Sequence, residues 1–170
     1  MTERMNNMWR FSSIVVTVLF ASASVSACAS KVDADPPNVA FDIGFPSTSA
    51  AVAVDSVRVL VFEGTQSSCL ELVQKRVSGQ DLPPRLVESR SLPPCELASA
   101  GNDVSLDLGK TYTFLATGES GGNLVLIGCA VQASYGSTMA LPIPLTLKDG
   151  ATRLPESKCA KLSDRCAGRC

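Results

Sequence analysis

Short runs in which every second residue is apolar recur along most of this sequence, and they constrain its fold more than any other feature. The runs begin near Val39 and are separated by clusters of Gly, Pro, Ser and Asn. This alternation is typical of strands with one buried face, and the clusters are typical of turns. The chain has 170 residues, of which 45% are hydrophobic, and this suits one domain. The sequence therefore predicts an all-β fold, a single small antiparallel β-sandwich over residues 39–148.

Six segments are predicted to be strands, and one of them, Val57–Phe62, is nearly all apolar, as expected of a central strand covered on both faces. The six segments are Phe41–Phe45, Val57–Phe62, Val104–Leu108, Thr111–Thr117, Leu124–Val131 and Met139–Leu147. In the fourth, alternation predicts that Tyr112, Phe114 and Ala116 face inward while the threonines face outward. The Gly-rich loop at 118–123 predicts a hairpin turn between the fourth and fifth strands.

Two further features refine this prediction. Pro142 and Pro144 donate no ladder hydrogen bond, so the last strand is expected at a sheet edge. The region from Leu106 to Val131 combines an alternating strand, a strand with Tyr112 and Phe114, and a Gly-rich hairpin. In this it resembles the prealbumin-like and immunoglobulin-like sandwich modules of bacterial surface proteins.

The segment 67–100 departs from the strand pattern. Residues Cys69–Arg76 predict two helical turns, with Leu70, Val73 and Val77 along one side. Two Pro-Pro pairs follow within the segment and prevent a long regular element. The segment is interpreted as an irregular excursion between strands.

The N-terminus has the pattern of a secretory signal. Arg4 and Arg10 precede the apolar run at 14–20, and this run gives way to small residues before Cys28. The apolar run is shorter than the ~20 residues that a membrane-spanning helix needs. Val25-Ser26-Ala27-Cys28 resembles a bacterial lipobox. An ordinary signal peptidase site, such as Ala23-Ser24-Val25, is the alternative.

Membership of the bacterial lipoprotein class would have definite consequences for this chain. The resemblance implies cleavage after residue 27, a diacylglycerol on Cys28 and anchoring to the bilayer. Residues 28–38 are charged and contain Pro36 and Pro37, so they are interpreted as a flexible tether. Ala29 stands where an aspartate would favour the inner membrane of enteric bacteria, so the outer membrane or cell surface is expected.

Six cysteines remain after Cys28, an even number in a chain directed out of the cytoplasm, and three disulfides are expected. Proximity suggests the pairs Cys69–Cys95, Cys129–Cys159 and Cys166–Cys170, although six cysteines allow 15 pairings. A C-terminal tail, 149–170, would be held to the domain by these bonds. A zinc site at Cys159, Cys166 and Cys170 is the alternative, but no Cys-x-x-Cys pair and no histidine supports it.

Composition excludes several functions. The sequence contains no histidine, which removes Ser-His-Asp and Cys-His catalysis. The formal net charge is −1, so the footprint expected of a nucleic-acid-binding protein is missing. The carboxylate pairs Asp33/Asp35 and Asp103/Asp107, together with Glu63, fit a tether and strand surfaces better than catalysis. No metal site and no cofactor are predicted.

The remaining function is binding or structural support in the cell envelope. Candidate binding residues lie in two segments expected to be exposed, and they are Lys75, Arg76, Arg85, Arg90 and Asn123. The partner would be an envelope protein or a polysaccharide. The alternatives are a subunit of a surface assembly joined by pairing of edge strands, and, more remotely, a small envelope enzyme without histidine.

Overall fold

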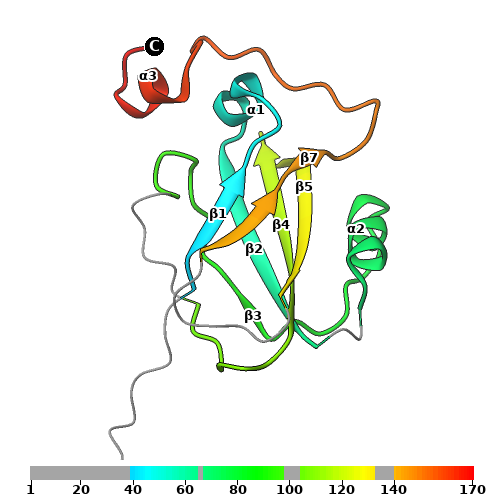
Figure 1. Ribbon diagram of the computed structural model, residues 1–170. Helices are drawn as coiled ribbons and strands as arrows, with labels where there is room; N and C mark the ends of the chain where they lie inside the picture. Colours follow the sequence, from blue (N-terminus) through cyan, green and yellow to red (C-terminus); the bar gives the residue numbers. More distant parts are fainter. Residues whose placement is uncertain (1–38, 65–66, 98–103, 133–139) are drawn as a thin grey trace, which may run out of the picture. The chain divides into compact units, whose positions relative to one another are not determined.

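The computed structural model describes residues 39–64, 67–97, 104–132 and 140–170 (Figure 1). The predicted signal peptide, Cys28 and the tether lie outside these residues. So do Asp103, the beginning of the last predicted strand at Met139, and the link from residue 133 to residue 138.

The described chain is mostly β-structure, and its largest element is an antiparallel five-stranded sheet in the order β3-β2-β4-β5-β7. The strands are β2 (Ser56–Glu63), β3 (Val87–Glu88), β4 (Tyr112–Ser120), β5 (Asn123–Gln132) and β7 (Thr146–Leu147). The prediction of a β-rich fold with an antiparallel sheet is confirmed. The hairpin between β4 and β5 is also confirmed, with Gly121 and Gly122 at φ of 54° and 77° in its two-residue turn.

A second sheet has two strands, β1 (Phe41–Gly44) and β6 (Leu141–Pro144), which pair in parallel (Figure 1). The prediction that all strands are antiparallel is therefore wrong. The last predicted strand is divided, because the chain pairs with β1 up to Pro144 and then with β5 from Thr146. Leu145 lies between the two pairings and is buried. Pro142 and Pro144 are exposed, as their position in the alternation predicts.

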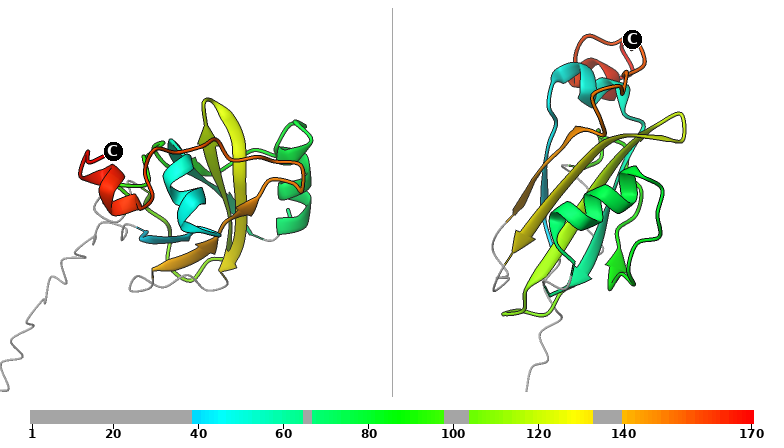
Figure 2. Two further views of the ribbon diagram at one scale, coloured as in Figure 1. Left: turned by 90° about the horizontal axis from the view of Figure 1, so that it is seen from above. Right: turned by 90° about the vertical axis from the view of Figure 1, so that its right-hand side faces the viewer.

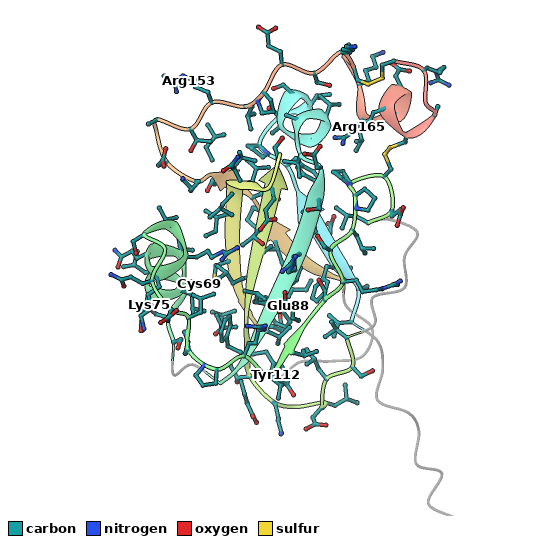
Figure 3. The ribbon with its side chains drawn as sticks, turned by 180° about the vertical axis from the view of Figure 1, so that it is seen from behind. Cys69, Lys75, Glu88, Tyr112, Arg153 and Arg165 are labelled. Atoms are coloured by element: carbon teal, nitrogen blue, oxygen red, sulfur yellow. A yellow bond between two sulfur atoms is a disulfide. The ribbon has the colours of Figure 1, made fainter. Side chains whose placement is uncertain are left out.

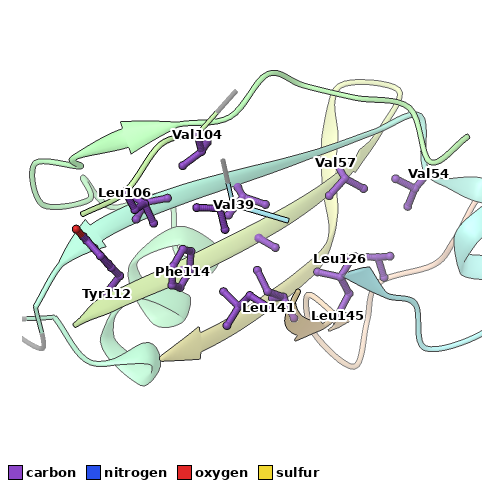
Figure 4. Close-up of a cluster of buried hydrophobic side chains, with 14 of the residues drawn as sticks. Val39, Val54, Val57, Val104, Leu106, Tyr112, Phe114, Leu126, Leu141 and Leu145 are labelled. Carbon is purple, nitrogen blue, oxygen red and sulfur yellow. The ribbon is translucent and has the colours of Figure 1, made fainter. Parts of the chain in front are cut away.

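The main core lies between the β1–β6 ribbon and one face of the larger sheet (Figure 4). Side chains from both sheets share this core, among them Phe114 of β4, Val59 of β2 and Ile143 of β6. Phe41 of β1 packs edge-on against Phe114, with 5.8 Å between the ring centroids. The predicted inward positions of Tyr112, Phe114 and Ala116 are confirmed, since all are buried here.

Helix α2 (Cys69–Val77) covers the opposite face of the larger sheet (Figure 2). Ser68 is the N-cap of the predicted helix, and its side chain accepts a hydrogen bond from the amide of Glu71 at 3.2 Å. Leu72 is fully buried against Leu115 and Ile127. Val73 and Val77 pack against the same cluster, as their shared side of the helix predicts, whereas Leu70 is 67% exposed.

The cover supplied by α2 also corrects the predicted threonine positions. Thr113 and Thr117 are buried rather than outward-facing, because α2 and its adjoining loop lie over that face. Their hydroxyls donate to backbone carbonyls, Thr113 to Gly64 at 3.1 Å and Thr117 to Arg58 at 3.5 Å. Both buried hydroxyls are thus satisfied.

Two short helices were not predicted, α1 (Thr48–Ala53) and α3 (Leu162–Cys166). Four of the six residues of α1 are buried, which places its alanines in the core. No helix in the described ranges is long and apolar enough to cross a membrane.

The predicted strand Val104–Leu108 is irregular, although Val104 and Leu106 are buried in the main core. The alternation there corresponds to burial, with a β-bridge at Ser105 but no longer strand.

Tyr112, at the start of β4, ties this irregular segment to the sheet. Its hydroxyl accepts a hydrogen bond from the amide of Asp107 at 3.1 Å and donates to the Asp107 carbonyl at 3.3 Å. Burial raises the pKa of Tyr112 above its usual value, with the nearby Asp107 carboxylate adding to the rise and the backbone hydrogen bond opposing it. The phenol therefore stays protonated in the folded protein at pH values where a free tyrosine ionises.

The raised pKa predicts a loss of stability at high pH. Above about pH 10 the unfolded chain loses the Tyr112 proton while the folded chain keeps it, so ionisation favours unfolding. At neutral pH, Tyr112→Phe should cost about 1 kcal/mol through the lost hydrogen bonds. Urea unfolding at about pH 8 and about pH 11 should show this difference shrinking as pH rises. A difference that is constant or grows with pH would contradict the assignment.

All six cysteines after Cys28 form disulfides, as predicted, but each predicted pairing is wrong. The pairs are Cys69–Cys129, Cys95–Cys166 and Cys159–Cys170, with Cα atoms 5.3 to 5.5 Å apart. These separations are normal for disulfides. The zinc alternative fails as well, because its three cysteines carry no free thiolate.

The physical reason for the different pairing is the position of α2. Packing of Leu72 against the sheet places Cys69, the first residue of the helix, over Cys129 of β5. Leu92, three residues before Cys95, forms a β-bridge with Val57 of β2. Because β4 separates β2 from β5 in the sheet, Cys95 lies away from Cys129. Cys95 pairs instead with Cys166 of α3.

Candidate functional site

The five predicted binding residues do not form one surface. Lys75 and Arg76 lie on α2, while Arg85 and Arg90 flank the edge strand β3. Figure 3 shows Lys75 and Glu88, the latter on β3, on well-separated elements. Asn123 is at the β4–β5 turn, where its amide nitrogen lies 3.3 Å from the carbonyl of Gly121.

Most of the predicted cations are paired with carboxylates of the same chain. Lys75 contacts Glu71 at 2.8 Å, and Arg76 contacts Glu119 at 3.3 Å. Arg85 contacts Glu88 at 2.7 Å. The opposite oxygen of Glu88 accepts from Arg58 at the same distance. Because these charges are compensated locally, the segment carries no strong anion-binding field.

A polar pocket of about 360 Å³ lies between α1, the β4–β5 turn and the C-terminal segment. Arg165 of α3 is central to it, and its guanidinium donates to the carbonyls of Val52 and Val54 at 2.8 and 2.6 Å. These carbonyls belong to the C-terminal end of α1, where a cation is favourable. The pocket therefore includes the contact that attaches α3 to α1.

Three polar side chains of this pocket, those of Asp55, Ser120 and Arg165, are engaged in hydrogen bonds within the chain. Asp55 accepts from Arg165 at 3.3 Å and from the amide of Gly121 at 2.7 Å. The Ser120 hydroxyl donates to the carbonyl of Ala53 at 2.7 Å. Within the described ranges, no group of three or more His, Cys, Asp or Glu side chains is arranged to hold a metal ion. The geometry of this pocket fits structural support.

A different surface runs along β1, on the side away from β6. Leu141 and Leu145 donate to the carbonyls of Ala40 and Gly44 at 2.9 and 2.7 Å. Even-numbered carbonyls of this segment thus point toward β6, and alternation points the amides and carbonyls of Phe41 and Ile43 the other way. Val39 uses this outer side to donate to Val104 at 2.8 Å. Beyond Val39, no residue of the described part is hydrogen-bonded to the outer edge of β1.

An apolar pocket of about 230 Å³ lies beside this open edge. It is lined by Phe41, Asp42, Ile43, Phe45, Pro94, Leu97 and Leu162. Asp42 is exposed and has no ion pair with any described residue. The open backbone groups, the apolar pocket and the single carboxylate together define the β1 edge surface.

The sequence indicated only part of this surface. The alternation of Phe41, Ile43 and Phe45 located the strand, but a period of two does not show which edge will be paired. The contributions of Pro94, Leu97 and Leu162 come from distant segments that the Cys95–Cys166 disulfide brings together.

No protein-family model, curated protein or solved structure matches this chain.

Proposed function

We propose that this protein is a lipid-anchored component of the bacterial cell envelope, with Cys28 as the site of acylation. The main support for this proposal is that Cys28 is the cysteine left outside the three disulfides. The chain has seven, and six of them are joined in three disulfides. Cys28 is left over, and it stands directly after the lipobox residues 25–27. Three disulfides also suit a compartment outside the cytoplasm.

The location within the envelope follows from the same segment. A diacylglycerol with a further acyl chain on the amino group anchors a protein stably without a basic surface. Such an anchor agrees with a formal net charge of −1. Ala29 favours the outer membrane or cell surface as the destination, and residues 29–38 would serve as the tether between bilayer and domain.

We further propose that the two sheets form a small β-sandwich. The β1–β6 ribbon and the larger sheet bury their facing side chains in one core. Tyr112 supports this proposal, since its hydroxyl binds the backbone five residues upstream. This arrangement is found at the tyrosine corner of immunoglobulin-like sandwiches.

The proposed role of this domain is to bind an envelope protein or a polysaccharide, or to support such a complex. A domain closed by three disulfides suits this role, because it keeps its surface in one conformation.

The anchor is tested by Cys28→Ser, expressed in a bacterium that processes lipoproteins. The wild-type protein should be recovered in the membrane fraction and released by detergent but not by high salt. The variant should be absent from the detergent-released fraction, because serine cannot form the thioether. Ser30→Ala is the matched control and should fractionate as the wild type does. Equal recovery of wild type and Cys28→Ser in the soluble fraction would favour an ordinary secretory signal instead.

A second candidate function is membership of a surface assembly joined by strand pairing. The observation that favours it is the open edge of β1, which contains no proline between Phe41 and Phe45. Strand addition at such an edge is an established mode of protein association.

A further inference from the structure

The two edges of the β1–β6 ribbon differ in their ability to accept another strand. The odd-numbered residues of β6 donate to β1, as Leu141 and Leu145 show. The backbone nitrogens of Pro142 and Pro144 therefore face the outer edge of β6. Proline has no amide hydrogen, so this edge lacks the donors that a ladder requires. The β1 edge presents the amides and carbonyls of Phe41 and Ile43, with no such block.

The larger sheet has edges of its own, but the two strands that end its order are short. β3 and β7 have two residues each, and they form the two sides of the larger sheet. β1 has four residues, Phe41–Gly44. β1 thus offers a continuous, proline-free row of backbone groups beside an apolar pocket.

Side chains around this edge specify what an added strand must carry. Its residues on the core side would lie beside Phe41 and Ile43 and enter the pocket lined by Pro94, Leu97 and Leu162. This pocket, of about 230 Å³, is apolar apart from Asp42. Residues on the other face of the added strand would lie beside Asp42 and Gly44, which are exposed. Oppositely charged side chains on neighbouring strands attract one another.

We propose that the outer edge of β1 binds an extended segment of a partner protein, in which apolar residues alternate with basic ones. The apolar residues occupy the pocket beside Phe41 and Ile43, and a lysine or arginine pairs with Asp42. Backbone hydrogen bonds to Phe41 and Ile43 supply affinity, while the pocket and the carboxylate supply specificity. This inference rests on the second candidate function and is independent of the lipid anchor.

The test uses the purified protein with the acetylated and amidated peptide Thr-Val-Lys-Val-Lys-Val-Thr. Saturable binding is expected, measured by fluorescence anisotropy of a labelled copy. The amides of Phe41 and Ile43 should exchange with deuterium about tenfold more slowly or better in the complex, because they gain acceptors. The amides of Asp42 and Gly44 already face β6 and should change little. A peptide in which the valines and the lysines are all N-methylated cannot donate backbone hydrogen bonds from these residues in either strand orientation and should not bind.

Reversing the charge at residue 42 distinguishes specific pairing with the peptide from non-specific binding. Asp42→Lys should weaken the lysine peptide about tenfold, and it should strengthen binding of the matching glutamate peptide. Asp81→Lys makes the same charge change in the exposed loop after α2 and is the matched control, expected to bind as the wild type does.

Several results would overturn the inference. One is slow exchange of the Phe41 and Ile43 amides without peptide at low protein concentration, since the chain itself would then cover the edge. A second is slow exchange that appears only as the protein self-associates, since the occupant would then be another copy. The third is failure of the lysine peptide to bind, or an equal effect of Asp42→Lys and Asp81→Lys. None of these results depends on Cys28, so loss of the anchor would be recognised separately.

Discussion

Replacing both Cys69 and Cys129 by alanine is expected to lower the free energy of unfolding by about 4 kcal/mol, a large share of the stability of a domain this size. The bond joins residues separated by 60 positions, so its loss releases a long loop in the unfolded chain. It also removes the covalent link between α2 and β5. Chemical denaturation of the variant and the wild type, followed by circular dichroism, measures the difference.

The local disulfide provides the matched control for this experiment. Cys159 and Cys170 are 11 positions apart, and their removal should cost less, about 3 kcal/mol. Free thiols test the pairing in the same samples. The Cys69→Ala, Cys129→Ala variant should expose no additional thiol, whereas Cys69→Ala combined with Cys95→Ala should expose two unpaired partners. The reverse result would restore the pairing that sequence proximity suggested.

Alanine substitutions at two leucines of α2 are expected to differ in their free energy of unfolding by an amount similar to the disulfide effect. Leu72→Ala should cost about 2 to 5 kcal/mol, because the side chain is fully buried against Leu115 and Ile127 and would leave a cavity. Leu70→Ala should change the free energy of unfolding by less than about 0.5 kcal/mol, because Leu70 is 67% exposed. Both variants keep the helix propensity of the segment. If Leu70→Ala were the more damaging variant, the packing of α2 on the sheet would be contradicted.

These two leucines show what the sequence alone could and could not determine. The apolar spacing from Cys69 onward is a local helix signal, so the helix was predictable. Its register depends on how Leu72 fits the opposing sheet, and that information comes from residues more than forty positions away. Burial of Thr113 and Thr117 follows from the same contact and was missed for the same reason.

The strand pairings also differ in whether the sequence could predict them. The β4–β5 hairpin is local, and Gly121 and Gly122 mark its turn, so both strands and their pairing were predicted. The parallel pairing of β1 with β6 joins residues about one hundred positions apart, and alternation carries no information on such a partner. The prolines of β6 indicated an edge correctly. They could not indicate that the open edge would be that of β1.

Disulfide pairing was the least predictable feature. Proximity in sequence favoured Cys69 with Cys95, but their segments leave the sheet at different places. The candidate binding residues were judged from exposure and charge, and Lys75, Arg76 and Arg85 are paired with acids that lie nearby in space. The β1 edge surface needed three distant segments and so was beyond the sequence pattern.

In the proposed lipid-anchored protein, Cys28 carries the lipid and the other six cysteines form disulfides. The intact mass of the protein extracted from bacterial membranes, before and after treatment with a thiol-alkylating reagent, tests both parts. We expect a chain that begins at Cys28 and carries two or three acyl chains, with no alkylated thiol. A mass without lipid, or one that increases on alkylation without prior reduction, would contradict the account.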